Sequence, residues 1–142
     1  MRHLARLRDK LGRRGLVLLM FGLVWVGQGF AVRQQPYSIG DHPVLAFEYV
    51  PVAVRVALWL VSGLFAVYVA LTGSPERDRH GYTVLVVLPI ERSLSYAFGW
   101  VEYMLPTEGG YAGGLRGALT WLGVTVAIMV IAGWPEPQRQ GR

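Results

Sequence analysis

The chain has 142 residues, of which 53% are hydrophobic and 16% are charged, and its formal net charge is +5. Soluble domains usually carry about 25% charged residues, so this composition excludes a disordered chain and argues against a water-soluble one. The length allows one compact unit, and we expect residues 1–142 to form a single integral membrane domain. The absence of cysteine excludes disulfides, thiol catalysis and cysteine-ligated metal sites.

The N-terminal segment Arg2–Arg14 is basic and has helical spacing, because Leu4, Leu7 and Leu11 fall on one face. This pattern predicts a short basic amphipathic helix that lies on the anionic inner leaflet of a bilayer. A basic run can also bind nucleic acid, but the membrane span that follows argues against a nucleic-acid partner.

The first predicted span covers residues 15–32, which are 18 residues without a charge. An alternative is a cleaved signal peptide, since a basic start, an apolar stretch and Gly29-Phe30-Ala31 resemble its three regions. The long basic region and the bulky Phe30 favour a span that is retained.

The second and fourth predicted spans cover residues 52–72 and 115–134. They contain uncharged runs of 17 residues from Val56 and 18 residues from Gly117. Runs of this length match the hydrocarbon core of a bilayer, which takes about 20 helical residues. In a soluble protein they would need an interior larger than this chain can build.

The third predicted span, residues 82–105, is interrupted at its centre by Glu91 and Arg92. A charge at the centre of a span costs about 2.5–3.5 kcal/mol on insertion scales, so these side chains must be covered by neighbouring helices. Pro89 favours a kink at this point. We expect an all-α membrane protein with a four-transmembrane-helix bundle. The alternative is three spans plus an interfacial helix.

The basic residues indicate the orientation of the chain. With four spans, ten of them fall on the side of the two termini, three fall on the other side, and Arg92 lies within the membrane. Because basic residues gather on the cytoplasmic side, we expect both termini in the cytoplasm. The three on the outer side are Arg33, Arg55 and Arg116.

Small residues recur along the predicted spans at helix-packing intervals. They allow close approach of helices within one chain or between copies, and the spacing does not distinguish these two roles. The residues are Gly22, Gly29, Ser62, Ala66, Ala70, Gly113 and Gly117.

An intramembrane polar stripe is predicted on the third span, where Arg92, Ser95 and Glu102 share a face and Glu91 adjoins it. Antiparallel packing of the second and third spans would bring Arg55 near Glu102. The stripe either lines a pore or an oligomer contact, or it is an ion-pair network that fixes the register of the helices.

Four tryptophans fall in the outer halves of the predicted spans, and interfacial aromatic belts explain them without a ligand. They are Trp25, Trp59, Trp100 and Trp121.

No enzyme motif or metal-ligand spacing is found, because the three histidines are far apart and no phosphate-binding loop or nucleophile motif occurs. We therefore expect no catalytic residue, no metal and no cofactor.

The sequence Arg13-Arg14-Gly15, followed by Phe21-Gly22-Leu-Val-Trp25, resembles small multi-span membrane proteins encoded by phages of actinobacteria, as does Pro89-Ile-Glu-Arg92-Ser-Leu-Ser-Tyr96. Some small phage membrane proteins are holins, which oligomerise and permeabilise the host inner membrane. The resemblance therefore implies a self-associating membrane protein. The central charged pair and the short tail after Trp134 depart from that pattern.

Three functions follow from these features. The first is a holin-like lysis factor that self-associates and permeabilises the membrane. The second is a superinfection-exclusion or membrane-anchoring protein that acts through the loop at residues 33–50. The third is a small transporter subunit that uses the polar stripe.

Overall fold

The computed structural model describes residues 2–34, 50–72, 75–105 and 110–134. These residues form four helices and no strand: α1 (Arg2–Gln34), α2 (Val52–Thr72), α3 (Pro75–Met104) and α4 (Gly114–Ala132). All four helices are long and apolar enough to cross a bilayer, over Leu11–Gln34, Val52–Thr72, Asp78–Met104 and Gly114–Ala132. The prediction of an all-helical fold with four helices long and apolar enough to span a membrane is confirmed for the described residues.

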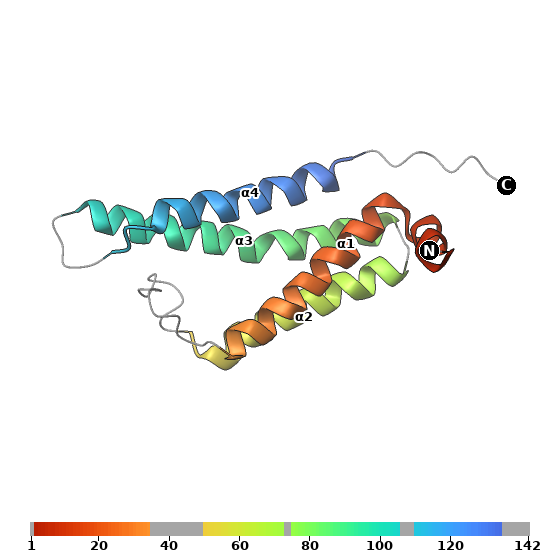
Figure 1. Cartoon of the computed structure of the whole chain (residues 1–142), viewed down its shortest axis with the longest axis horizontal. Helices are drawn as coiled ribbons and strands as arrows, with labels where there is room; N and C mark the ends of the chain where they lie inside the picture. Colours follow the sequence, from red (N-terminus) through yellow and green to blue (C-terminus); the bar gives the residue numbers. More distant parts are fainter. Residues whose placement is uncertain (1, 35–49, 73–74, 106–109, 135–142) are drawn as a thin grey trace.

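The third span is the one that the sequence left most open. α3 remains helical through Pro89 and past Glu91 and Arg92. It runs beside α4, and the two helices form an antiparallel pair (Figure 1). Its segment Asp78–Met104 is long and apolar enough to cross a bilayer, as are the corresponding segments of the other three helices. This favours four spans over three spans plus an interfacial helix.

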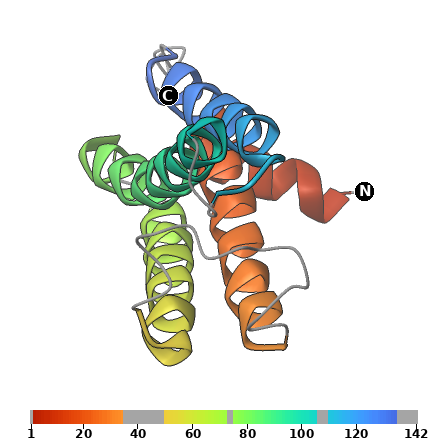
Figure 2. The ribbon, with the colours of Figure 1, turned by 90° about the vertical axis from the view of Figure 1, so that its left-hand side faces the viewer.

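Gly12 divides α1 into a short N-terminal segment and a long apolar helix. Its backbone has φ 72° and ψ 178°, a conformation that glycine adopts at little cost and other residues rarely do. The segment before Gly12 points away from the rest of α1 (Figures 1 and 2). The side chains of Leu4 and Leu7 lie outside the described part of the structure, so the contact of this segment with lipid stays a prediction.

α1 and α2 form the first helical hairpin, and two glycines set their distance. A Cβ atom built on Gly63 would lie 2.6 Å from the carbonyl oxygen of Gly22, and one built on Gly22 would lie 2.9 Å from the carbonyl oxygen of Gly63. Distances this short exclude a side chain at either position. The backbones therefore touch, which is how helices associate in lipid, where hydrophobic burial does not drive them together.

α3 and α4 form the second helical hairpin. Gly114 lies against the backbone of α3 at Tyr96 and Trp100, and Gly117 lies against the ring of Tyr96. The hydroxyl of Ser93 donates a hydrogen bond of 2.9 Å to the carbonyl of Ala118. Helices that follow one another in the chain thus form the closely packed pairs.

The turn into α4 depends on a second glycine with positive φ. Gly110 has φ +96°, and a Cβ atom there would lie 2.1 Å from the backbone nitrogen of Tyr103. The next residue, Tyr111, donates its backbone N–H to the carbonyl of Gly99 at 2.8 Å. This hydrogen bond ties the turn to α3.

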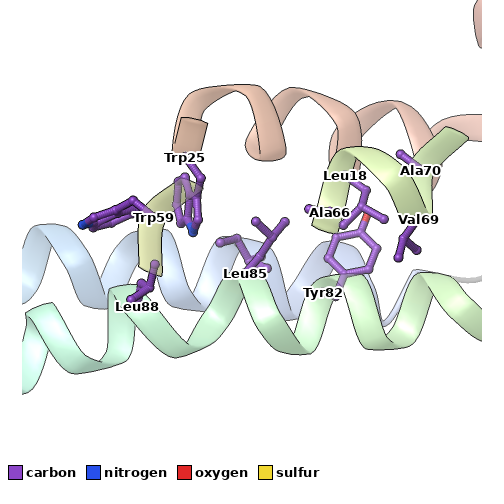
Figure 3. Packing of buried hydrophobic residues seen from close by; sticks show 10 residues of the cluster. Leu18, Trp25, Trp59, Ala66, Val69, Ala70, Tyr82, Leu85 and Leu88 are labelled. Carbon is purple, nitrogen blue, oxygen red and sulfur yellow. The ribbon is translucent and has the colours of Figure 1, made fainter. Parts of the chain in front are cut away.

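The two hairpins meet at one end of the molecule and diverge toward the other (Figures 1 and 2). They meet where α2 ends and α3 begins, and Leu18, Val69, Tyr82 and Leu85 are buried there in one cluster (Figure 3). α1 begins and α4 ends at this same end (Figure 1). Four passes across a membrane would therefore leave the start of α1 and the end of α4 on one face.

Large apolar side chains are exposed along all four helices, for example Met20, Val61, Phe98 and Val130. Soluble proteins rarely expose continuous apolar surface of this extent, whereas lipid-facing helices require it. The exposed faces and the four long helices together indicate an integral membrane protein.

Tyr82 joins the hairpins by a hydrogen bond, which we expect to contribute about 0.6 kcal/mol, the average for such bonds between membrane helices. Its hydroxyl donates to the carbonyl of Arg14 at 2.7 Å, and the Arg14 guanidinium lies 5.7 Å from its ring centroid. Tyr82→Phe should lower the unfolding free energy by that amount in a denaturant titration of the protein in micelles. Tyr68→Phe is the matched control, because Tyr68 is exposed on α2. Equal effects of the two changes would contradict the assignment.

Candidate functional site

The polar stripe of α3 is the first candidate site. Ser95 is buried and donates a hydrogen bond of 2.7 Å to Oε1 of Glu91, one turn earlier on the same helix. Glu91, Arg92 and Glu102 are partly buried. The helix therefore turns Ser95 toward the interior and leaves the charged side chains at the border between interior and surface.

Glu91 lies at the middle of the candidate span Asp78–Met104. Its Oε1 atom accepts the hydrogen bond from Ser95, while its Oε2 atom is enclosed without a hydrogen-bond partner among the described residues. An enclosed carboxylate oxygen without a partner is costly in a medium of low dielectric. The site is thus polar, central in the span and incompletely satisfied.

Arg55 lies in the first turn of α2, whose N–H groups at Val54 and Arg55 both bond to the carbonyl of Pro51. Its side chain is partly buried, and its Nε atom is enclosed without a hydrogen-bond partner among the described residues. The structure does not bring Arg55 to Glu102, because the hairpins diverge at this end and the start of α2 lies away from the end of α3 (Figure 1). The prediction that antiparallel packing of the second and third spans brings Arg55 near Glu102 was therefore wrong.

Tryptophans form an aromatic cluster inside the molecule. Trp25 and Trp59 are only 3% and 1% exposed. Edge-to-face contacts join Phe21 to Trp25 and Trp25 to Trp59, with ring centroids 5.7 and 5.4 Å apart, and Trp59 lies 6.0 Å from Trp121. For Trp25 and Trp59 an interfacial belt is therefore the wrong explanation. Their rings fill the space at which α1, α2 and α4 meet.

An apolar groove of about 340 Å³ opens between α2 and α3. We call it the α2–α3 groove. Its α2 side is lined by Val54, Ala57, Leu58, Val61 and Ser62. Its α3 side is lined by Val84, Val87 and Leu88. The hydroxyl of Ser62 is already bonded to the carbonyl of Leu58, so the groove presents an apolar surface.

The small residues singled out from the sequence lie mostly at contacts within the chain. Ser62, Ala66 and Ala70 are buried in α2. A Cβ atom on Gly29 would meet Leu60 and Trp59, and one on Gly113 would meet the ring of Tyr111. With Gly22 and Gly117 already placed in the hairpins, these faces are occupied by neighbouring helices of the same chain.

Gly63 and Gly114 lie at the closest contacts between helices. Neither was among the predicted packing residues. Gly63 follows Ser62 directly, so a spacing of four from Ser62 passes over it. A spacing of four that starts from Gly109 or Gly113 likewise passes over Gly114. A spacing of four from Gly114 reaches Ala118, whereas Gly63 has Trp59 and Val67 at that spacing and reaches a small residue only at Ala66, three positions later.

Parts of the sequence analysis fall outside the described residues. Residues 35–49 of the loop proposed as an effector are not among the described residues. The tail from residue 135 is not among them either. Among the side chains that the structure describes, no group of three or more His, Cys, Asp or Glu comes together in a way that could hold a metal ion.

No protein-family model matches the sequence, and neither a curated protein nor a solved structure matches the chain.

Proposed function

We propose that this protein is a holin-like membrane protein that self-associates in the bilayer and makes it permeable. The observation that carries the proposal is the Glu91 carboxylate, which lies at the middle of its span with one oxygen lacking a hydrogen-bond partner among the described residues. Ionisable groups within membrane segments usually face a bundle interior or a water-filled path. Self-association that opens this enclosed site would let polar groups of a second copy, or water between copies, reach the oxygen.

The contacts within the chain limit which surfaces are available for contact between copies. The glycine and alanine faces are occupied in the two hairpins, which removes them as the contact between copies. The partly buried side chains of Glu91 and Arg92 remain as polar surface near the middle of α3. We therefore assign self-association to the polar stripe and not to the small residues.

The location belongs to the same proposal. We infer a phage-encoded protein of the bacterial inner membrane with both termini in the cytoplasm. The excess of basic residues on the side of the termini supports this orientation, and so does the position of the start of α1 and the end of α4 at one end of the molecule (Figure 1). The basic segment before Gly12 would then lie on the anionic inner leaflet.

Induced expression in a bacterium should collapse the membrane potential and halt growth, measured with a potential-sensitive dye and by culture density. Glu91→Leu should delay the collapse at equal protein level, because it removes the unsatisfied carboxylate. Thr83→Leu is the matched control, since Thr83 is an exposed polar residue of the same helix, and it should behave as the wild type. Cells that keep their potential and viability at high expression would refute permeabilisation.

Self-association is tested separately, because the chain lacks cysteine and single cysteines report contacts without background. Ile90→Cys, which is exposed beside Glu91, should form disulfide-linked dimers in oxidised membranes. Ala127→Cys on an exposed face of α4 should not. Intact growth together with blocked infection by a related phage would instead support superinfection exclusion, and Glu91-dependent solute flux at constant potential would support a transporter subunit.

A further inference from the structure

The segment before Gly12, residues 2–11, lies across the direction of α3 and α4. It is seen nearly end-on in Figure 1 and along its length in Figure 2, whereas α3 and α4 are seen along their length in Figure 1 and nearly end-on in Figure 2. Where α3 and α4 cross a bilayer, the segment therefore runs along the membrane surface. It lies at the end of the molecule where α1 begins and α4 ends (Figure 1).

Gly12 sets this change of direction at the boundary of the first candidate span, which begins at Leu11. Its φ of 72° and ψ of 178° fall in a region that is open essentially to glycine alone, so another residue would favour a continuous helix. A continuous helix would place Arg2 about 15 Å beyond Gly12 along the axis of α1, which exceeds the Debye length of about 8 Å at physiological salt. The corner at Gly12 therefore keeps the charges of the segment within electrostatic range of the membrane surface.

Contacts with α3 hold α1 immediately after the corner. The hydroxyl of Tyr82 donates a hydrogen bond of 2.7 Å to the carbonyl of Arg14. Leu18, one turn further along α1, is fully buried, and a Cβ atom built on Gly81 would lie 2.8 Å from its side chain. Leu11, just before the corner, is buried as well. The direction of the segment is thus set by the packing of the bundle.

The segment carries four basic residues against one acidic residue, which leaves three net positive charges. Anionic headgroups attract such a cluster, and each basic residue near an anionic surface favours binding about fivefold. The leucines of the segment share one helical face, which suits insertion between headgroups. The basic residues are Arg2, Arg6, Arg8 and Lys10, and the acidic residue is Asp9.

We propose that residues 2–11 form a surface anchor that binds the headgroups of anionic phospholipids, and that Gly12 turns this anchor into the plane of the bilayer where it can bind them. The anchor rests on the proposed placement of the helices across a membrane. It is independent of permeabilisation, because a protein that leaves the membrane potential intact would carry the same anchor. Nucleic acid is another polyanion that suits a basic segment, but the corner directs this segment along a lipid surface.

The test measures hydrogen–deuterium exchange of the full-length protein in nanodiscs of phosphatidylcholine alone and of phosphatidylcholine and phosphatidylglycerol in equal parts. The amides of residues 2–11 should exchange at least about tenfold more slowly in the anionic nanodiscs, because three net positive charges contribute to binding. High salt should remove this difference, and the amides of α4 should show no difference at all. Equal exchange of the segment in the two lipids would overturn the proposal. So would equal protection by a single-stranded oligonucleotide added to the phosphatidylcholine nanodiscs.

Gly12→Ala tests the corner, because it keeps every charge but favours a continuous helix. Most of the segment would then extend beyond the Debye length, and the difference in exchange between the two lipids should fall to about twofold or less. Gly27→Ala is the matched control on the same helix, since a Cβ atom at Gly27 would have no other atom within 4 Å. It should keep the difference of the wild type. A Gly12→Ala variant that also keeps it would contradict the role of the corner.

The triple variant Arg6→Gln/Arg8→Gln/Lys10→Gln tests the charges, because it keeps the corner and removes the net positive charge of the segment. It should lose the difference between the two lipids. Arg33→Gln/Arg116→Gln removes two exposed arginines elsewhere on the molecule and should retain the difference. Exchange of α4 as in the wild type shows that each variant is folded. A folded triple variant with the difference of the wild type would contradict binding through charge.

Discussion

Gly63→Leu should destabilise the protein by about 3 kcal/mol, the upper part of the range for inserting side-chain volume into a packed interior. The reason is that a Cβ atom at this position would lie 2.6 Å from the carbonyl oxygen of Gly22 and 2.7 Å from the backbone nitrogen of Val26. Backbone atoms cannot rotate aside as side chains can, so α1 and α2 would have to separate. A denaturant titration in mixed micelles, followed by tryptophan fluorescence, measures the loss.

Gly27→Leu is the control for this change. Gly27 lies on α1, and a Cβ atom there would have no other atom within 4 Å, so the added side chain would face lipid. We expect a small gain or no change, because leucine favours a helix more than glycine does, by about 1 kcal/mol at most. If Gly63→Leu and Gly27→Leu had the same stability, the close approach of α1 and α2 would be wrong.

Trp59→Ala should be the second large effect. Trp59 is 1% exposed and contacts the rings of Trp25 and Trp121, so it joins three helices. Removal of a buried aromatic side chain from a water-soluble core costs about 3–5 kcal/mol. In a membrane the contribution from transfer out of water is absent when the unfolded reference also lies in lipid. We therefore expect a loss of about 2–3 kcal/mol, from the cavity and the lost ring contacts.

Trp134→Ala is the matched control, because Trp134 is 52% exposed beyond the end of α4. The same micelle titration should show little change for it. A Trp59→Ala variant as stable as Trp134→Ala would contradict the aromatic cluster as a structural centre. Near-ultraviolet circular dichroism gives a second readout, since the signal of closely packed indole rings should fall only in Trp59→Ala.

The four helices could be predicted because the thickness of the bilayer sets the length of an uncharged run that spans it. This length does not depend on which helices pack beside it. Residues 52–72 were predicted with the bounds that the structure gives to α2. α3 begins at Pro75, seven residues before the predicted start at Tyr82. The charged residues of this first part do not oppose a helix outside the hydrocarbon layer, so hydropathy cannot locate its true start.

The candidate site was harder to predict, because it depends on the angle between the hairpins. Sequence position gives the depth of Arg55 and Glu102 but not the distance between the helices that carry them. Trp25 and Trp59 have the same depth as interfacial residues would, and only the crossing of α1 and α2 turns them inward. The α2–α3 groove depends on the angle at which α2 leaves α3, and no local sequence pattern records that angle.

The contacts between the hairpins extend from Leu18, Val69, Tyr82 and Leu85 near one end of the molecule to Trp59 and Trp121, and the hairpins diverge beyond them (Figure 1). From Leu88 to the end of α3 is about 24 Å, so a rotation of the second hairpin by about 10° about this contact region would displace that end by about 4 Å. A change of one side chain in the contact region would thus shift the helix ends at the opposite membrane face, while the geometry inside each hairpin stayed unchanged.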